Sequence, residues 1–274
     1  MDNNLNRTLS PLEAKLVLQL EWEERPLISR TEIMRSLNGS TQRADRVIRS
    51  LLAKNWLERL SSGRYLFVPA SRGPQGIPDS NMLAIGRHFV DPYYFAYATA
   101  AAHYRFTSQS RTTVWIATTK HAPDRTIRGT RFRFISMVKR KFFGYESTEV
   151  FNEKVNLSDP EKTVIDCVDR PDLAGGIGEV TRIIARAARA LNWGNLSKHA
   201  LQFNSVATVQ RLGYLAGRAR VEIPNDCLQQ LRSLLRKNSR SFLAFPGRWG
   251  RTGHYDPEWQ VIVNVSDSEI LSEM

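Results

Sequence analysis

Residues 29 to 68 read SRTEIMRSLNGSTQRADRVIRSLLAKNWLERLSSGRYLFV, and this stretch decides the fold expected for the N-terminal part of the chain. Ser29, with Glu32 three residues later, is typical of a helix N-terminus, because each side chain can bond to the other's backbone N–H. Asn38-Gly39 predicts a turn, since both residues tolerate a positive φ. The next helix, the third of this N-terminal region, is expected from Ser40 or Thr41. Its apolar stripe consists of Ala44, Val47, Ile48, Leu51 and Leu52.

A hairpin and an upstream helix complete this region. Two runs, 56–60 and 64–68, flank Ser61-Ser62-Gly63 and predict two short strands. Upstream, Ser10-Pro11 is a cap followed by a first-turn proline, and it begins a helix that Pro26 ends. Helix, helix, tight turn, helix and hairpin is the order of a winged helix-turn-helix. Residues 1–70 are therefore expected to form such a DNA-binding domain.

The composition changes between Pro69 and Ser80. The segment PASRGPQGIPDS holds three prolines and two glycines without apolar periodicity, so we expect a linker at 71–80. Residues 81–274 are expected to form a larger mixed domain, which makes the chain α+β. Its expected strands lie at 114–118, 131–135 and 259–265. A first helix of this domain is expected to begin at Asp91-Pro92. Further helices are expected at about 160–170, 179–191, 195–203, 205–219 and 225–237.

The net charge of +12 favours a polyanionic partner such as nucleic acid. The sequence contains no apolar run of transmembrane length and no pattern of a secretory signal, so a cytoplasmic protein without a membrane partner is expected. Cys167 and Cys227 lie in apolar helical patterns and are expected to be buried free thiols. Such sparse cysteine use fits a reducing compartment.

The predicted third helix carries the residues that suit DNA recognition. With its apolar stripe inward, its polar side chains lie outside, where Arg and Gln can contact base edges and Ser or Thr can hold phosphates. The expected contacts to double-stranded DNA are Ser40, Thr41, Gln42, Arg43, Arg46 and Arg49, with Arg59 and Arg64 beside the hairpin tip. An ordinary solvated surface on a protein-interaction module is the alternative. The outer side of this helix has three arginines and only one aspartate, Asp45, and this excess of positive charge favours DNA binding over the alternative.

Two further basic segments lie downstream. Eight basic residues between Lys120 and Lys141 accompany only one acidic residue, Asp124. The phenylalanines among them fit either base stacking or, as favoured here, a sheet with aromatic rings inward and arginines outward. The second basic surface expected from this segment comprises Arg128, Arg131, Arg133, Lys139, Arg140 and Lys141. Arg182, Arg186 and Arg189 share one side of a predicted helix, either solvated or docking a partner.

Motifs for catalysis are missing from the sequence. The five histidines are isolated, G-x-S-x-G does not occur, and the turn at 173–178 lacks the Lys-Ser/Thr of a phosphate-binding loop. Asp166 and Asp169 share one side of a predicted helix, and a nucleic-acid enzyme that uses Asp166 is the catalytic alternative. We expect a protein that is not an enzyme and that needs no cofactor or metal.

Several segments in order resemble the AbiEi family of antitoxins from type IV toxin–antitoxin systems. They are LSDPEKTVID at 157–166, Gly175-Gly176 before Glu179-Val180, and RLGYL at 211–215, preceded by the expected helix at Asp91–His103 and the VWIAT strand. The resemblance covers roughly residues 10 to 220. Residues from about 221 onward would then be a C-terminal extension.

The resemblance implies an antitoxin that is also a transcriptional autorepressor, of a kind associated with phage defence. The winged helix would bind inverted repeats in its own promoter as paired protomers, either monomeric or dimeric in solution. The second domain would counteract a co-encoded AbiEii-type nucleotidyltransferase-like toxin without a stable complex. Arg182, Arg186 and Arg189 would form a candidate antitoxicity surface. The alternative is a stand-alone winged-helix regulator whose second domain senses a ligand or oligomerises.

Overall fold

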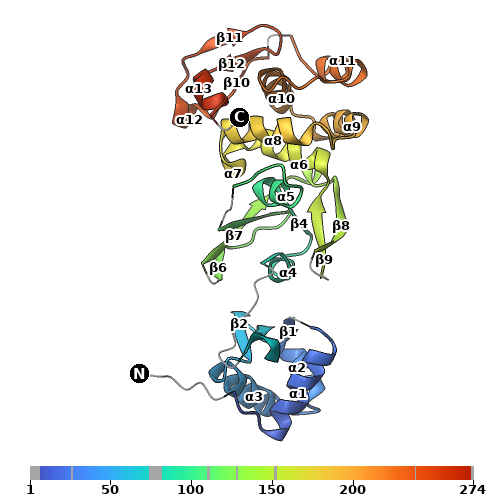
Figure 1. Cartoon of the computed structure of the whole chain (residues 1–274), viewed down its shortest axis with the longest axis vertical. Coiled ribbons are helices and arrows are strands. Elements are labelled where there is room, and N and C mark those ends of the chain that lie inside the picture. The colour runs from blue at the N-terminus through green and yellow to red at the C-terminus, as the bar shows by residue number, and fades with distance from the viewer. Residues whose placement is uncertain are drawn as a thin grey trace. The chain divides into compact units, whose positions relative to one another are not determined.

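The computed structural model describes residues 7–25, 27–73, 82–109, 112–127, 129–150, 153–237 and 239–272. The chain is a mixed α+β protein, as the sequence predicts. It divides into two compact units, residues 1–85 and residues 86–274 (Figure 1). Of the linker predicted at 71–80, only residues 71–73 are among the described residues.

The first unit combines three helices with a small antiparallel sheet. The helices are α1 (Pro11–Trp22), α2 (Arg30–Ser36) and α3 (Thr41–Ala53). The strands are β1 (Leu27–Ser29), β2 (Leu57–Ser61) and β3 (Arg64–Phe67), in the order β1-β3-β2. The helices and the hairpin occur where the sequence predicts them, whereas β1 was not predicted. Leu16, Ile33 and Leu51 are completely buried at the centre of this unit.

Each of these three helices begins after a serine. Ser10 and Ser29 form capping boxes with Glu13 and Glu32, so that two backbone N–H groups are satisfied at each helix start. Ser40 caps α3 by accepting a hydrogen bond from the backbone of Arg43. These caps are local, so the sequence predicts the helix starts well.

A six-stranded sheet lies at the start of the second unit. Its strands are β4 (Tyr93–Phe95), β5 (Thr113–Thr118), β6 (Arg125–Ile127), β7 (Thr130–Ser136), β8 (Tyr145–Val150) and β9 (Glu153–Ser158). Their order is β6-β7-β5-β4-β9-β8. The pairs β5–β7 and β4–β9 are parallel and the other neighbours are antiparallel.

The helix expected from Asp91-Pro92 begins later than predicted. Residues 93–95 form the central strand β4, and helix α5 (Tyr97–His103) starts only after it. Tyr94 and Phe95 are both completely buried. Consecutive aromatic residues that are buried on both sides of a sheet favour a strand, which the proline cap pattern did not reveal.

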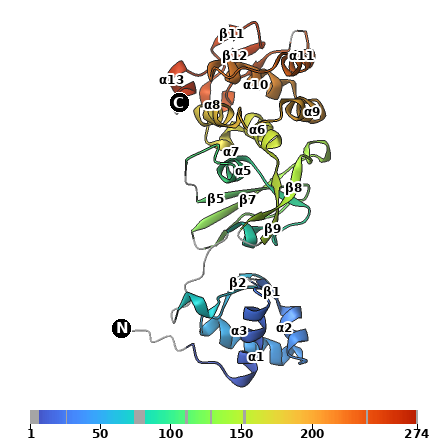
Figure 2. The ribbon, with the colours of Figure 1, turned by 45° about the vertical axis from the view of Figure 1, so that its right-hand side comes forward.

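Helix α5 lies on one side of this sheet, and the helices that follow lead from there to a second, smaller sheet (Figures 1 and 2). They are α6 (Pro160–Asp169), α7 (Pro171–Ala174), α8 (Ile177–Ala187), α9 (Trp193–Phe203), α10 (Val206–Arg218) and α11 (Asn225–Ser233). The small sheet has the order β10-β12-β11 and comprises β10 (Ser241–Phe242), β11 (His254–Asp256) and β12 (Val261–Val263). The remaining α-helices of the described residues are short: α4 (Met82–Gly86), α12 (Pro246–Trp249) and α13 (Asp267–Ile270).

Residues beyond 220 belong to the same hydrophobic core as the helices before them. Leu231, Trp259 and Val261 are buried in one cluster with side chains of α6, α8 and α10. A Cβ on Gly213 of α10 would meet the Trp259 ring at 2.2 Å, so this position needs a glycine for the small sheet to pack closely. The C-terminal segment is thus an integral part of the second unit.

Both cysteines are buried and neither forms a disulfide bond, as predicted: Cys167 lies in α6 and Cys227 in α11. No helix in the described part of the chain is long and apolar enough to cross a membrane.

Candidate nucleic-acid interface

Helix α3 has one buried side and one polar side. Ala44, Val47, Ile48 and Leu51 point into the core of the first unit. The exposed residues are Thr41, Gln42, Arg43, Arg46 and Arg49. Every predicted contact residue on this helix is therefore accessible, including Ser40 at its cap. Arginine and glutamine side chains on such a surface have the chemistry for contacts to base edges and phosphates.

Asp45, the acidic residue on this side of α3, is neutralised by a residue of α2. Arg30 donates two hydrogen bonds of 2.7 Å to its two carboxylate oxygens. These hydrogen bonds hold the pKa of Asp45 below its usual value. The remaining charges on the outer side of α3 are Arg43, Arg46 and Arg49, so this surface is positive.

Arg30 also fixes the hairpin tip. Its backbone N–H donates a 2.8 Å hydrogen bond to the carbonyl of Gly63, which has a φ of +69° in the turn between β2 and β3. Arg59 and Arg64 lie on either side of this turn and are both exposed. Through its backbone and its guanidinium, Arg30 therefore connects the hairpin tip to α3, which brings the two predicted contact regions together.

The sequence pattern does not predict a role for Arg30. It is 15 residues from Asp45, and their pairing depends on the angle at which α2 packs against α3. No local spacing rule covers a contact of that kind, so only the folded structure reveals it.

A second ion pair connects α3 to α1. Lys54, which follows α3, lies 2.7 Å from the buried carboxylate of Glu13. Burial raises the pKa of Glu13, but hydrogen bonds from Lys54, Ser50 and Ser10 outweigh this and lower it to about 2. Glu13 therefore both caps α1 and holds the end of α3.

The second predicted basic surface is less continuous than expected, because three of its members have partners. Arg133 pairs with Asp124. Arg140 donates to the carbonyls of Phe203 and Asn204 at the end of α9, at 2.7 and 3.1 Å. Lys141 lies 2.9 Å from Asp169 of α6. Arg140 and Lys141 thus connect the sheet side of the unit to its helices. Arg131 and Lys139 are exposed, and Arg128 lies outside the described residues.

Strand β7 has its aromatic rings and arginines on different sides. Phe132 is completely buried, and its ring contacts Phe89 with the centroids 5.0 Å apart. Arg131 and Arg133 are exposed. The Phe132 ring is therefore core, and it offers no surface for stacking a base.

The three arginines of the α8 region that were predicted to share one accessible surface differ in their exposure. Arg182 is only 12% exposed because it pairs with the buried carboxylate of Glu179 one turn earlier. Arg186 and Arg189 are exposed. The prediction that all three share one accessible surface is thus corrected for Arg182.

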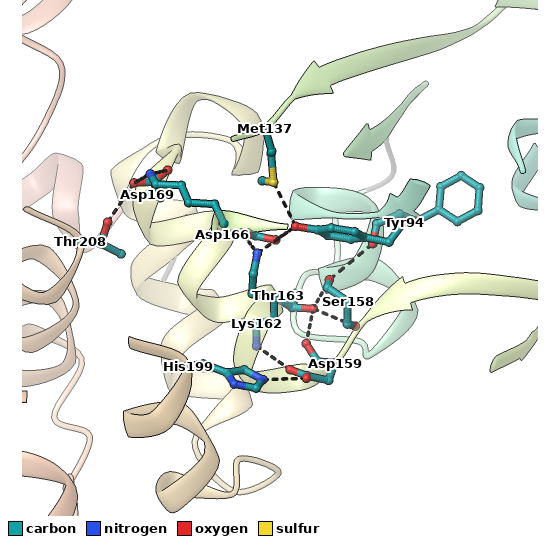
Figure 3. Close-up of polar contacts among 12 residues, drawn as sticks. Tyr94, Met137, Ser158, Asp159, Lys162, Thr163, Asp166, Asp169, His199 and Thr208 are labelled. Atoms are coloured by element: carbon teal, nitrogen blue, oxygen red, sulfur yellow. Dashed lines mark hydrogen bonds and ion pairs between the residues drawn. The ribbon is translucent and has the colours of Figure 1, made fainter. Parts of the chain in front are cut away.

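A buried polar cluster surrounds the start of α6 (Figure 3). Lys162 and Asp166 form a completely buried ion pair. Lys162 donates to the hydroxyl of Tyr94 at 2.8 Å, and that hydroxyl donates to Asp166 at 3.1 Å. Burial raises the pKa of Asp166, although the Lys162 charge opposes this. Asp166, the residue named for the catalytic alternative, therefore has no access to solvent.

The rest of the LSDPEKTVID segment completes this cluster. Asp159 caps α6 through the backbone N–H of Lys162 at 2.7 Å, and its other oxygen lies 2.8 Å from His199 of α9. The hydroxyls of Ser158 and Thr163 are 2.7 Å apart. Each of these polar side chains joins β9 or α9 to α6, so the segment that resembles the antitoxin family builds the centre of this unit.

The two other family-like segments also have structural roles. Gly175 and Gly176 adopt φ values of 112° and 104°, which only glycine adopts easily, in the turn before α8. Arg211 of α10 donates a 3.0 Å hydrogen bond to the carbonyl of Phe242 in β10. The three segments that carry the resemblance therefore fix α6, α8 and α10 in the unit.

No family model matches this chain, and no curated protein sequence matches it. Among solved structures, the chain is similar to the crystal structure of the RV2827C protein from Mycobacterium tuberculosis. The TM-score is 0.64 and the sequence identity 15%, and the alignment covers 95% of this chain and 94% of that chain. The likeness extends over both units and shows a shared fold.

Proposed function

We propose that this chain is an antitoxin of the AbiEi type that also represses its own operon. Its first unit is a winged helix-turn-helix that binds inverted repeats in double-stranded promoter DNA. Its second unit counteracts a co-encoded nucleotidyltransferase-like toxin of the AbiEii type. The protein acts by binding and without catalysis.

The charge on α3 is the observation that carries the proposal for DNA. Arg43, Arg46 and Arg49 are exposed, while the carboxylate of Asp45 is neutralised by Arg30. A helix of this composition with the hairpin tip beside it fits major-groove recognition with a backbone contact from the hairpin. Salt-dependent affinity for DNA follows, because each phosphate contact releases counterions.

Two observations support the antitoxin role: the order of the family-like segments in the sequence and their positions in the core of the second unit. The residues of LSDPEKTVID pack at the centre of the second unit, as a resemblance based on a shared core would require. The exposed Arg186 and Arg189 on α8 are the candidate antitoxicity surface, with Arg182 supporting it from a more buried position.

Two experiments test the two parts. In the first, the full chain is titrated against its own upstream DNA and against a scrambled duplex, and tighter binding to the upstream DNA is expected. In the second, the neighbouring nucleotidyltransferase-like gene is expressed with and without the chain, and growth rescue is expected. Binding without rescue would favour the stand-alone regulator, and rescue by residues 82–274 alone would assign antitoxicity to the second unit.

A further inference from the structure

The segment from Arg236 to Tyr255 has an unusual charge. It contains five Lys or Arg residues and one histidine, and no Asp or Glu. Its arginines at 248 and 251 are exposed. A segment whose exposed side chains are positive and that has no carboxylate of its own attracts a polyanion.

The same segment exposes aromatic rings. Phe245 is 75% exposed, Trp249 36% and Tyr255 43%. In the described part of the chain, three of the four exposed Phe, Tyr and Trp side chains lie here, and the fourth is Trp22 of α1. Exposed aromatic rings that contribute to no core are candidates for contacts with a ligand.

The stretch from Ala244 to Gly250, here called the α12 loop, is held in place by a buried side-chain amide. Asn264, which is 7% exposed, accepts a 2.9 Å hydrogen bond from the N–H of Ala244 and donates to the carbonyl of Ala244 at 3.1 Å. It also donates to the carbonyl of Gly250 at 2.9 Å. Both ends of the α12 loop are therefore tied to one side chain. Rings presented on such a fixed loop lose little conformational entropy when they bind.

Arginines lie beside two of the rings. The guanidinium of Arg248 is 5.4 Å from the Trp249 ring centre, and that of Arg240 is 4.9 Å from the Tyr255 ring centre. Tyr255 is paired with Ile262 in the small sheet, whereas the neighbouring Val261 and Val263 point into the core. The Tyr255 ring therefore stands on the side of this sheet that faces away from the core.

We infer that the exposed rings and arginines of the segment from Arg240 to Tyr255 bind single-stranded nucleic acid, independently of α3. Unpaired bases stack on Phe245, Trp249 and Tyr255, and phosphates pair with Arg240, Arg248 and Arg251. Interleaved rings and basic groups are the chemistry that recognises single strands, since every base offers a flat face and every nucleotide a charge. Double-stranded DNA offers no free base faces, so the duplex bound at α3 does not compete for the rings.

The test uses the full chain and labelled homopolymers of about 15 nucleotides, oligo(U) and oligo(dT), with a duplex of the same length, followed by fluorescence anisotropy. Phe245→Ala, Trp249→Ala and Tyr255→Ala should each weaken single-strand binding roughly 5- to 150-fold. Binding of the duplex should not change. The matched control Trp22→Ala removes an exposed ring from the first unit and should leave single-strand affinity unchanged. The ratio of the oligo(U) and oligo(dT) affinities identifies RNA or DNA as the preferred strand.

Two further variants separate stacking from charge and from folding. Trp249→Phe keeps a flat ring and should retain most of the affinity, whereas Trp249→Leu keeps apolar volume without a ring and should lose it. Equal single-strand affinities for the original protein and the three alanine variants would overturn the inference. Competition by polyglutamate as strong as competition by unlabelled oligo(U) would also overturn it, because the surface would then recognise charge alone.

Discussion

Arg30 of α2 binds Asp45 of α3 through two parallel hydrogen bonds of 2.7 Å each. The pair lies beside the arginines of α3, and the backbone of Arg30 holds the hairpin tip at Gly63. One residue thus sets both the charge of the proposed DNA-binding surface and the position of the hairpin relative to α3.

Replacing Arg30 should weaken DNA binding more than it weakens the fold. In Arg30→Gln the carboxylate of Asp45 is left without its cation and repels phosphate, so the affinity for the chain's own upstream DNA should fall severalfold. Both side chains are more than 40% exposed, so the melting temperature should change little. The double variant Arg30→Gln/Asp45→Asn should recover part of the affinity. Anisotropy titration measures this, and a double variant that binds no better than Arg30→Gln would contradict the account.

The buried pair of Lys162 and Asp166 predicts a stability effect in the second unit. Lys162→Met leaves a buried carboxylate without its cation and should lower the free energy of unfolding by about 3–5 kcal/mol. Lys162→Met/Asp166→Leu removes both charges and should cost less than either single variant. Urea unfolding measures these values, with the exposed Lys198→Met of α9 as the control. A double variant as unstable as the sum of the singles would argue against a coupled pair.

Acid should destabilise the first unit through Glu13. The folded-state pKa of this carboxyl is about 2 and its ordinary value is 4.5, so its ionised form is stabilised by folding. A lowered pKa contributes stability above the unfolded value, and this stability is lost as the pH falls from about 4.5 to about 2. The difference in unfolding free energy between the original protein and Glu13→Gln should shrink over this window in urea titrations. A difference that is constant with pH would contradict the role of Glu13.

The two thiols should be unreactive in the folded protein. Burial raises the pKa of Cys227 to about 11, and Cys167 has no exposed surface. A disulfide reagent at pH 8 should therefore react slowly with the native chain and at once with two thiols in denaturant. Rapid reaction of one thiol per native chain would show that a cysteine is accessible.

Local signals explain why the first unit could be predicted from sequence. Ser10, Ser29 and Ser40 mark helix starts through bonds to residues within three positions, and the apolar stripe of α3 sets its buried side. The sequence does not predict strand β1, because three residues carry no periodicity. Residues 93–95 were assigned to a helix, because their burial in the sheet depends on strands far along the chain.

In the candidate sites, too, local patterns could be predicted from the sequence, whereas contacts between distant residues could not. The exposed side of α3 follows from a period of 3.6 residues, but Arg30 beside Asp45 requires the packing of two helices. Lys162 and Asp166 are one helical turn apart, yet their partner Tyr94 lies 68 residues before Lys162. Arg182 has the spacing of a surface residue, and only the burial of Glu179 explains why it is mostly covered.

Titration of the chain's own upstream DNA with Arg43→Ala and Arg46→Ala tests the central claim most directly. Each variant should lose about 1–3 kcal/mol of binding free energy if its arginine contacts a base, and the slope of affinity against salt should become less steep if it contacts a phosphate. Lys198→Ala removes an exposed positive charge of α9 in the other unit and should bind as the original protein does. Unchanged affinity and salt dependence in both arginine variants would contradict the assignment of α3 as the DNA-binding helix.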